Sequence, residues 1–586
     1  MKRLPVKATA LLPCRAPAAA LSAACLIMAA AVTLPASAYD AVSAQRLASP
    51  EPENWLMYRR TYDSWGYSPL EQINTENVKQ LRPLWTFSTG VEEAHQSPPL
   101  VNNGVMFITT PRNQVIALDA RTGEQLWRYR RELPADLFQL HPTNRGVALY
   151  GDRVYLATVD AHLVALAAST GEVIWDVEVE DYLRGYYMTL APLAVEGRIL
   201  VGMSGGEFGI RGFIQAFSAE DGQSQWKTFM VPGPGEPGHE TWGEKAWKRG
   251  GVSVWVTGSY DPEARLTYWG TGNAGPWIAD QRGGDNLYAN SVVALDIDSG
   301  AIRAHHQYHW ADSWDWDEVA APLLIDLKRG DKTVPGLVHA GRNGYLWQLE
   351  RHGERINFLS AQPYVHQNVF TSIDPESGRP SYDPMRVPRT GERAEYCPSL
   401  WGGKDWPPVA FNPVTGYLYI PANENLCSAI TAEPAKYRPG ELYLGVSFAN
   451  IEVFPLPEAA DHIGELQAWD INTGQKVWTQ TFKSHNWGPV LATAGGLVFS
   501  GGTSDREFRA FDARSGEILW HQRTNSGVVG VPVSYAVDGQ QYVAVQSGWG
   551  VDAQRKQEFL NKAFGTQLEV PQGGVLWVFG LPEQTP

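Results

Sequence analysis

The amino-acid sequence predicts an all-β fold, an eight-bladed β-propeller built from tryptophan-docking repeats. Two observations lead to this prediction. The chain contains 57 Gly, 40 Pro and 23 Trp among 586 residues and has little sustained helical periodicity, which favours short strands joined by many turns. In addition, one short phrase of apolar strand, tight turn and Trp recurs along the chain.

The recurring phrase places a Trp four residues after a Gly in every intact copy. In the first copy the apolar run 115–120 leads to Gly123 and then to Trp127. This pattern is typical of a β-hairpin, and its indole ring can be buried only between stacked sheets, as in a propeller. The last strand, 575–579, is expected to pair with N-terminal strands and close the ring. The other intact copies end at Trp175, Trp226, Trp478 and Trp520, and a degenerate copy has Ala304 instead.

The N-terminus has the three parts of a secretory signal peptide. Basic residues precede an apolar run at 18–34, and Ala36-Ser37-Ala38 then forms a small-residue cleavage site. We therefore expect residues 1–38 to be a signal peptide and the mature chain to be periplasmic. A lipid anchor at Cys25 is the weaker alternative, because Ser22 stands where a large aliphatic residue is expected. No later segment is apolar for long enough to span a bilayer.

Charge and cysteine content narrow the range of partners. A net charge of −15 disfavours nucleic acid and anionic membranes but suits a small basic electron carrier. Cleavage would leave only Cys397 and Cys427, which we expect to form one structural disulfide in an oxidising compartment. The sequence has no Cys-x-x-Cys-His motif, so no c-type haem is attached to it.

Two familiar enzyme motifs occur in the wrong context. Residues 202–206 match the G-x-S-x-G elbow of serine hydrolases, but no helical pattern follows them. Residues 270–275 match the dinucleotide fingerprint G-x-G-x-x-G, yet Pro276-Trp277 comes next instead of a helix. A serine hydrolase and an NAD enzyme are therefore both disfavoured.

Three polar clusters at residues 204–209, 270–273 and 312–318 offer carboxylates and an amide at loop positions. Such hard oxygen ligands suit calcium-like ions, although each cluster alone is typical of a solvated turn. The clusters occur along the chain together with further motifs. Among these motifs are 65–70, Asn144-Arg145-Gly146, 247–251, 258–262, 284–288, Arg342-Asn343-Gly344 and Cys397-Pro398-Ser399. With these motifs, residues 39–586 resemble the quinoprotein alcohol dehydrogenases, propellers that carry pyrroloquinoline quinone (PQQ) and include methanol dehydrogenase.

The resemblance implies a single PQQ-binding propeller domain, 39–586, in which PQQ lies beside a metal ion. The metal ligands would be Glu207, Asn273 and Asp315, together with oxygens of PQQ. The cofactor-binding residues would be Gln96, Arg145, Thr189, Ser204, Gly205, Gly206, Trp255, Arg342, Asp405 and Trp487. Trp255 would be the floor beneath the flat PQQ ring, and Trp277 would line the substrate cavity.

The resemblance also implies a mechanism. The metal would polarise a quinone carbonyl, and Asp315 would remove the alcohol proton as hydride moves to PQQ. Electrons would then pass to an external acceptor, for which we expect a soluble c-type cytochrome.

Asp317 bears on the identity of the metal. If the segment 315–317 is extended, both Asp315 and Asp317 point the same way. In the lanthanide-dependent branch of the family, an extra Asp two residues after the catalytic Asp is the distinguishing ligand. A lanthanide(III) ion is therefore favoured, with Ca²⁺ as the alternative. The alternative is that the side chain of Asp317 turns to solvent and binds no metal.

Two positions depart from the family pattern. Gln139-Leu140 stand where many members have adjacent cysteines, so the packing on the second face of PQQ is in doubt. Asp405 stands where an Asn is usual, and it would add negative charge near an anionic cofactor unless Lys404 or another cation offsets it.

Several alternatives remain open from the sequence. A calcium-dependent version of the enzyme is one, and a non-catalytic propeller scaffold is another. The scaffold would not need Glu207, Asn273, Asp315 and Arg342 together. The alcohol, the electron acceptor and the oligomeric state, a homodimer included, are not identified.

Overall fold

The computed structural model describes residues 39–456 and 461–582. The signal peptide expected at 1–38 lies outside these residues. The described residues contain two α-helices, α1 (Ala44–Ala48) and α2 (Asp552–Phe564). They also contain short 3-10 helices at Val78–Gln80, Tyr182–Arg184, Gly206–Phe208 (η3), His239–Thr241, Ala246–Arg249, Ala279–Gln281, Pro384–Arg386 and Phe448–Asn450. None of these helices is long and apolar enough to cross a membrane.

Eight of the sheets in the described residues have four or five strands each. The sheets formed in simple chain order are β3 (Leu100–Asn102), β4 (Val105–Thr110), β5 (Gln114–Asp119), β6 (Gln125–Arg130); β7 (Ala148–Tyr150), β8 (Arg153–Ala157), β9 (His162–Ala167), β10 (Val173–Glu178); β11 (Leu193–Val195), β12 (Arg198–Gly202), β13 (Phe213–Ser218), β14 (Ser224–Phe229); β15 (Ser259–Asp261), β16 (Leu266–Gly270), β17 (Ser291–Asp296), β18 (Ile302–Gln307); and β19 (Leu323–Arg329), β20 (Lys332–Ala340), β21 (Tyr345–His352), β22 (Arg355–Pro363).

The other three large sheets include strands that are distant in sequence. They are β26 (Ala410–Asn412), β27 (Tyr417–Asn423), β30 (Gly464–Asp470), β31 (Gln475–Phe482); β1 (Tyr67–Ser68), β32 (Val490–Thr493), β33 (Leu497–Ser500), β34 (Glu507–Asp512), β35 (Ile518–Arg523); and β2 (Arg82–Ser88), β38 (Val575–Gly580), β37 (Gln540–Ser547), β36 (Val533–Val537). Two small sheets are formed by β23 (Phe370–Ile373) with β24 (Pro380–Tyr382), and by β25 (Arg393–Tyr396), β28 (Leu426–Thr431) and β29 (Ile451–Pro455).

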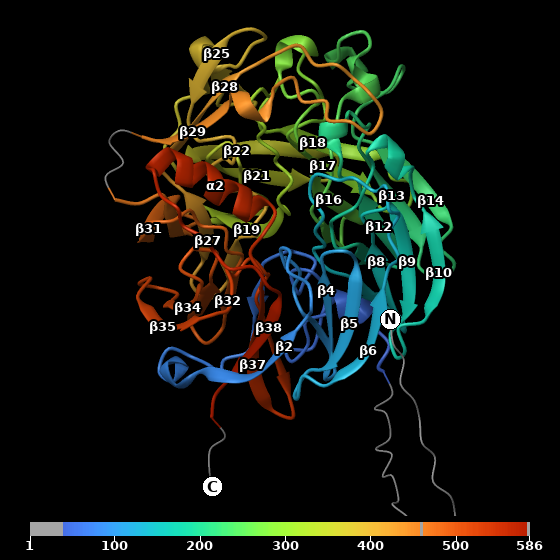
Figure 1. Ribbon diagram of the computed structural model, residues 1–586, viewed down its shortest axis with the longest axis vertical. Helices are drawn as coiled ribbons and strands as arrows, with labels where there is room; N and C mark the ends of the chain where they lie inside the picture. The colour runs from blue at the N-terminus through green and yellow to red at the C-terminus, as the bar shows by residue number, and fades with distance from the viewer. Residues whose placement is uncertain (1–38, 457–460, 583–586) are drawn as a thin grey trace, which may run out of the picture. The chain divides into compact units, whose positions relative to one another are not determined.

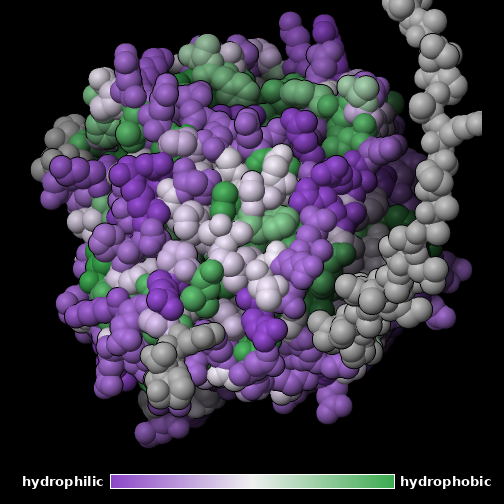
Figure 2. Space-filling view, turned by 60° about the horizontal axis from the view of Figure 1, so that its bottom comes forward, coloured by the Kyte–Doolittle hydropathy of each residue, from purple (hydrophilic) through white to green (hydrophobic). Residues whose placement is uncertain are grey.

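The chain ends meet in one sheet. Strand β38 pairs antiparallel with β2, so that Leu576 lies opposite Phe87. This confirms the predicted pairing of the last strand with an N-terminal strand. Figure 1 shows the large sheets following one another in chain order, with red β38 beside blue β2. The expected disulfide between Cys397 and Cys427 is also present and ties the segment after β25 to β28. In the face that Figure 2 presents, most side chains are hydrophilic and the apolar ones form small areas among them.

Each repeat Trp packs against a neighbouring sheet, as the sequence predicts. Trp127 on β6 donates its Nε1–H to the carbonyl of Ala168, which follows β9 in the next sheet, at 2.9 Å. Its ring also lies under Gly171, whose turn joins β9 to β10. Three further repeat tryptophans donate to a neighbouring sheet or segment in the same way: Trp226 to Ile297, Trp478 to Ala513 and Trp520 to Leu81.

This docking gives a stability prediction at Gly171, which has φ +75°. A Cβ there would lie 2.5 Å from the Trp127 ring. Gly171→Ala is therefore expected to incur both a left-handed backbone penalty of about 1–2 kcal/mol and overpacking of about 1–3 kcal/mol. Gly151→Ala is the matched control, because Gly151 has φ +61° and a Cβ there would meet nothing within 4 Å. Urea unfolding should show the larger loss for Gly171→Ala, and equal losses would contradict the docking role.

Candidate functional site

A cavity of about 350 Å³ gathers most of the residues that the sequence analysis selected. They come from the loops of successive sheets, so the fold brings together side chains far apart in sequence. The selected residues that line it are Arg145, Thr189, Ser204, Gly205, Glu207, Trp255, Trp277, Asp315, Asp317, Arg342 and Asp405. Four others do not line it: Gln96, Gly206, Asn273 and Trp487. Of these four, Asn273 contacts two lining carboxylates and Trp487 contacts a lining lysine, as described below.

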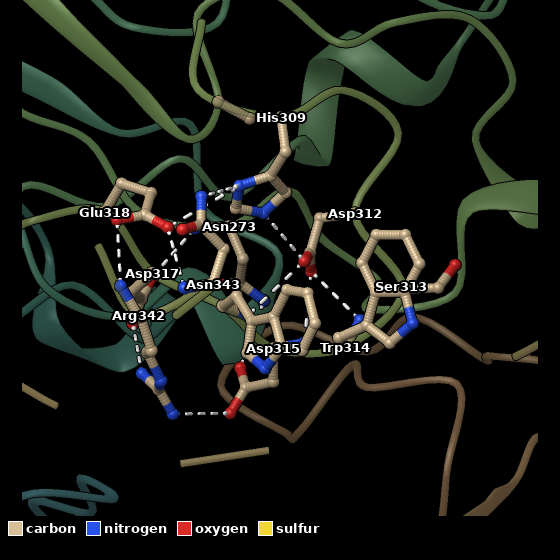
Figure 3. A network of polar contacts seen from close by, with 12 residues as sticks. Asn273, His309, Asp312, Ser313, Trp314, Asp315, Asp317, Glu318, Arg342 and Asn343 are labelled. Carbon is tan, nitrogen blue, oxygen red and sulfur yellow. Dashed lines mark hydrogen bonds and ion pairs between the residues drawn. The ribbon is translucent and has the colours of Figure 1, made fainter. Parts of the chain in front are cut away.

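The loop between β18 and β19 has a constrained backbone at Asp315. The carboxylate of Asp312 accepts hydrogen bonds from the backbone N–H groups of Trp314, Asp315 and Trp316. Asp315 itself has φ +65°, a conformation that few residues other than Gly adopt. Strained backbone of this kind is concentrated at functional sites, where surrounding contacts hold it in place. Figure 3 shows Asp312 at the centre of these contacts.

Asp315 and Asp317 both face Arg342, although Asp315 at φ +65° is not extended and strand alternation is therefore not the reason. Nη2 of Arg342 lies 3.3 Å from Oδ2 of Asp315, and Nη1 lies 3.3 Å from Oδ2 of Asp317 (Figure 3). Asn273 joins the same group, because its backbone N–H donates to Asp317 at 2.7 Å and its Nδ2 donates to Asp315 at 3.2 Å. Trp255 donates its indole N–H to Asp317 at 3.2 Å. Asp317 is 7% exposed, so the alternative that it turns to solvent is wrong.

Burial raises the pKa values of Asp315 and Asp317. Burial raises the pKa of Asp315 well above its ordinary value; Arg342 opposes this shift, while Asp317 and Glu207 add to it. Burial likewise raises the pKa of Asp317 to about 7, with Arg342 opposing and Glu207 contributing. The cause in both cases is desolvation of a carboxylate beside other carboxylates. Strongly shifted groups that line one cavity indicate a functional site.

The buried carboxylate of Glu318 fixes the backbone of Arg342. Glu318 is fully buried and accepts hydrogen bonds from the backbone N–H groups of Arg342 and Asn343 at 3.0 and 3.1 Å. His339 lies 2.6 Å from the same carboxylate and His309 lies 3.6 Å from it. The tight turn between β20 and β21 therefore presents the guanidinium toward the cavity (Figure 3).

A second polar group lies on another wall. Arg145 donates to the hydroxyl of Thr189 at 2.7 Å, and this hydroxyl lies 3.0 Å from that of Ser204. The guanidinium lies over the rings of Trp255 and Trp406, at 4.6 and 4.9 Å from their centroids. Its Nε is buried and has no hydrogen-bond partner in residues 39–456 and 461–582. Arg145, Thr189 and Ser204, three of the cofactor-binding residues that the resemblance implies, thus form one chain of contacts.

The turn that carries Glu207 depends on glycine. Gly205 has φ +103°, and a Cβ there would lie 2.1 Å from the carbonyl oxygen of Gly185. The turn leads into η3, on which Glu207 reaches the cavity. Gln96 is buried but does not line the cavity, and both polar atoms of its side-chain amide lack partners among the described residues.

The charge of Asp405 is offset by a residue that the sequence analysis did not consider. Lys556 on α2 donates to Asp405 at 3.0 Å, whereas the ammonium of Lys404 donates to the backbone carbonyl of Asp405. Arg342 lies 3.6 Å from the same carboxylate. Burial works against the charge of Asp405, but Arg342 and Lys556 outweigh it and lower the pKa.

The segment that replaces the adjacent cysteines is bound to α2. His141 lies 2.8 Å from the carboxylate of Asp552, and Arg555 donates to the carbonyl of Leu140 at 3.0 Å. Leu140 and His141 both line the cavity. Polar contacts to a helix therefore anchor the loop at this position.

Sequence reasoning missed a large part of the cavity wall. Helix α2 was not predicted from the sequence, although the spacing of its buried residues is helical. Its buried residues Ala553, Lys556, Gln557 and Leu560 follow helical periodicity, but two of the four are polar. The further lining residues that the sequence did not reveal are Leu140, His141, Tyr187, Leu400, Trp401, Phe448, Ile451, Asp552, Arg555, Lys556, Glu558 and Phe559.

Comparison with known proteins places this site in a family. The family described as "Glucose/ethanol/alcohol dehydrogenase, beta-propeller domain" matches residues 55–371 and 479–543. The chain is 38% identical to quinoprotein alcohol dehydrogenase PedH of Pseudomonas putida, over 97% of this chain and 98% of that protein. It is 36% identical to the lanthanide-dependent methanol dehydrogenase of Methylacidiphilum fumariolicum, over 85% of each.

Among solved structures, a europium-containing methanol dehydrogenase matches with a TM-score of 0.85 and 34% identity, covering 92% of this chain and 99% of that one. The β-propeller and the PQQ family expected from the sequence are thereby confirmed. The chain belongs to the family of PQQ-dependent quinoprotein alcohol dehydrogenases, which are oxidoreductases acting on alcohols.

Proposed function

We propose that the protein is a periplasmic, lanthanide-dependent alcohol dehydrogenase that oxidises an alcohol to an aldehyde or ketone with PQQ as cofactor. The observation that carries this proposal is the pair Asp315 and Asp317, buried side by side in the cavity and facing Arg342. We also propose that the eight large sheets are the eight blades of the propeller.

The cavity residues fit a flat, anionic cofactor. Trp255 offers a ring surface on the cavity wall, and Arg145 and Arg342 offer guanidinium groups suited to carboxylates and quinone oxygens. Within the part of the chain that the structure describes, the buried Nε of Arg145 has no partner, so it is available to donate to such a group. A cavity of about 350 Å³ is within the range of small-molecule cofactor sites.

The donor set also fits a hard metal ion. Glu207, Asp315 and Asp317 supply carboxylate oxygens and Asn273 supplies an amide, the ligands that calcium-like ions prefer. In the described ranges no three His, Cys, Asp or Glu side chains are placed so that they could hold a metal ion, so the fit rests on the type of donor and not on their spacing. A cation among them would relieve the desolvated charges that raise the pKa of Asp315 and Asp317.

The extra carboxylate favours a trivalent ion. Asp317 adds a third carboxylate to Glu207 and Asp315, which suits an ion of higher charge than Ca²⁺. Two similar proteins point the same way, since one is named lanthanide-dependent and the other europium-containing.

The residues then have separate tasks in the reaction. Bound PQQ and its metal ion would supply the hydride acceptor and the positive charge that activates it. Asp315 would accept the proton of the alcohol hydroxyl, and the bound cation would favour its ionised form. Arg342 stabilises the ionised carboxylate through its contact at 3.3 Å. Trp277 lines the cavity and excludes water beside the substrate.

Two features support the location and the electron acceptor. Residues 1–38 have the layout of a signal peptide, and the acidic chain without a haem motif suits a small basic c-type cytochrome as acceptor.

Dye-linked oxidation of a panel of alcohols tests the proposal, using apo-protein supplied with PQQ and either La³⁺ or Ca²⁺. We expect activity that requires PQQ and is higher with La³⁺. Higher activity with Ca²⁺ would contradict the lanthanide proposal and favour the calcium-dependent alternative. If the protein neither oxidises an alcohol nor binds PQQ with either metal, the proposed enzymatic function is contradicted. A non-catalytic propeller scaffold would then be favoured.

A further inference from the structure

Helix α2 directs a buried lysine into the cavity. Lys556 is 3% exposed and lines the cavity together with Arg342 and Asp405. Its Nζ lies 3.2 Å from the centroid of the Trp487 ring and 5.0 Å from that of Trp401. A lysine ammonium is strongly hydrated in water, so its burial is costly unless hydrogen bonds replace the lost water.

The ammonium group is only partly satisfied. Within the described residues its hydrogen bonds end at one acceptor, Oδ2 of Asp405 at 3.0 Å. An ammonium has three donors, so two remain for another acceptor in the cavity. The nearby aromatic rings favour the positive charge but accept no ordinary hydrogen bond.

Asp405 keeps this lysine in place but uses only one of its donors. Its carboxylate lies between two cations, Lys556 at 3.0 Å and Arg342 at 3.6 Å. Arg342 also pairs with Asp315 and Asp317, whereas Lys556 has Asp405 as its one hydrogen-bond acceptor among the described residues. The two unused donors of this buried cation therefore point to an anionic acceptor in the cavity.

Contacts at the start of α2 hold the helix in position. The ion pair between His141 and Asp552 and the hydrogen bond from Arg555 to Leu140 bind its first turn to a loop that also lines the cavity. The side chain of Lys556 is therefore carried by an anchored element, as a ligand-binding group requires.

We propose that Lys556 is a further cofactor-binding residue, which donates hydrogen bonds to an anionic oxygen of bound PQQ while Asp405 orients it. This inference rests on the proposed function, because it takes PQQ as the ligand. It assigns a binding role to α2, outside the residues that the family resemblance selected.

Equilibrium titration of apo-protein with PQQ in the presence of La³⁺, followed by tryptophan fluorescence, tests the inference. Lys556→Met is expected to weaken PQQ binding at least about tenfold, the effect of losing a charge-assisted hydrogen bond. Lys562→Met is the matched control, since Lys562 is an exposed lysine on the same helix. It should bind PQQ as the wild type does.

The double variant Asp405→Asn/Lys556→Met separates binding from charge balance. If Lys556 contacts PQQ, the double variant binds PQQ at least about tenfold more weakly than Asp405→Asn alone. Equal affinities of the double variant and Asp405→Asn would overturn the inference, because Lys556 would then only neutralise Asp405. The double variant also carries the test if Lys556→Met fails to fold, as it leaves no unpaired buried carboxylate.

The two proposals fail in different ways. Equal PQQ affinity of the wild type and Lys556→Met would overturn the role of Lys556 alone. A wild type that does not bind PQQ would overturn the proposed function, and the role of Lys556 with it.

Discussion

Replacing Asp315 with Asn is expected to lower kcat about 10²–10⁴-fold, the usual contribution of a general base. An amide cannot accept the proton of the alcohol, so the reaction loses its base while the side chain keeps its size. Asn also tolerates the left-handed backbone at φ +65° better than most residues, so the loop should keep its shape. Steady-state dye-linked kinetics measures the effect.

The amount of bound PQQ and metal must be measured for the same Asp315→Asn sample. Asp315 is also a proposed metal ligand, and an empty site would lower the rate for a different reason. Asp315→Ala is the comparison variant, because it removes the base and adds backbone strain. A fully loaded Asp315→Asn protein with wild-type kcat would contradict the assignment of Asp315 as the base.

Asp317→Asn is expected to remove the preference for La³⁺ over Ca²⁺. The substitution removes one negative charge from a buried group of carboxylates. It keeps an oxygen that can accept the backbone N–H of Asn273, whose nitrogen lies 2.7 Å from Oδ1 of Asp317 in the wild type. Loss of this negative charge should weaken La³⁺ binding about 10–100-fold, the range observed when groups that support a metal site are replaced. Competition between the two ions for the apo-protein with PQQ gives the ratio of affinities directly.

An unchanged La³⁺-to-Ca²⁺ ratio in Asp317→Asn would contradict the metal assignment while leaving the dehydrogenase intact. Asp326→Asn is a suitable control, because Asp326 is an exposed carboxylate on β19 and its loss changes the net charge by the same amount.

The repeats were predictable because each encodes its own local structure. The turn Gly and the Trp four residues later belong to one hairpin, and their spacing requires no knowledge of the tertiary fold. The contact from Trp127 to the next sheet then follows from the need to bury the indole ring. The disulfide between Cys397 and Cys427 was predictable because the proposed cleavage at residue 38 would leave no other cysteine.

The part of the cavity wall that α2 forms was not predictable from the sequence. In α2 the buried positions include Lys556 and Gln557, so polar residues obscure the apolar stripe by which a helix is recognised. The lysine that offsets Asp405 lies 151 positions further along the chain, whereas Lys404 is its immediate neighbour. Local charge patterns cannot reveal such a pairing, because only the tertiary fold brings α2 to the cavity.

A single-turnover experiment tests the central claim most directly. Protein loaded with PQQ and La³⁺ is mixed with excess alcohol in the absence of any electron acceptor, and the absorption of bound PQQ is followed. The account predicts a rapid change from the oxidised to the reduced spectrum in the wild type, and a change about 10²–10⁴-fold slower in Asp315→Asn. An oxidised spectrum that every alcohol leaves unchanged in the loaded wild type would contradict the account.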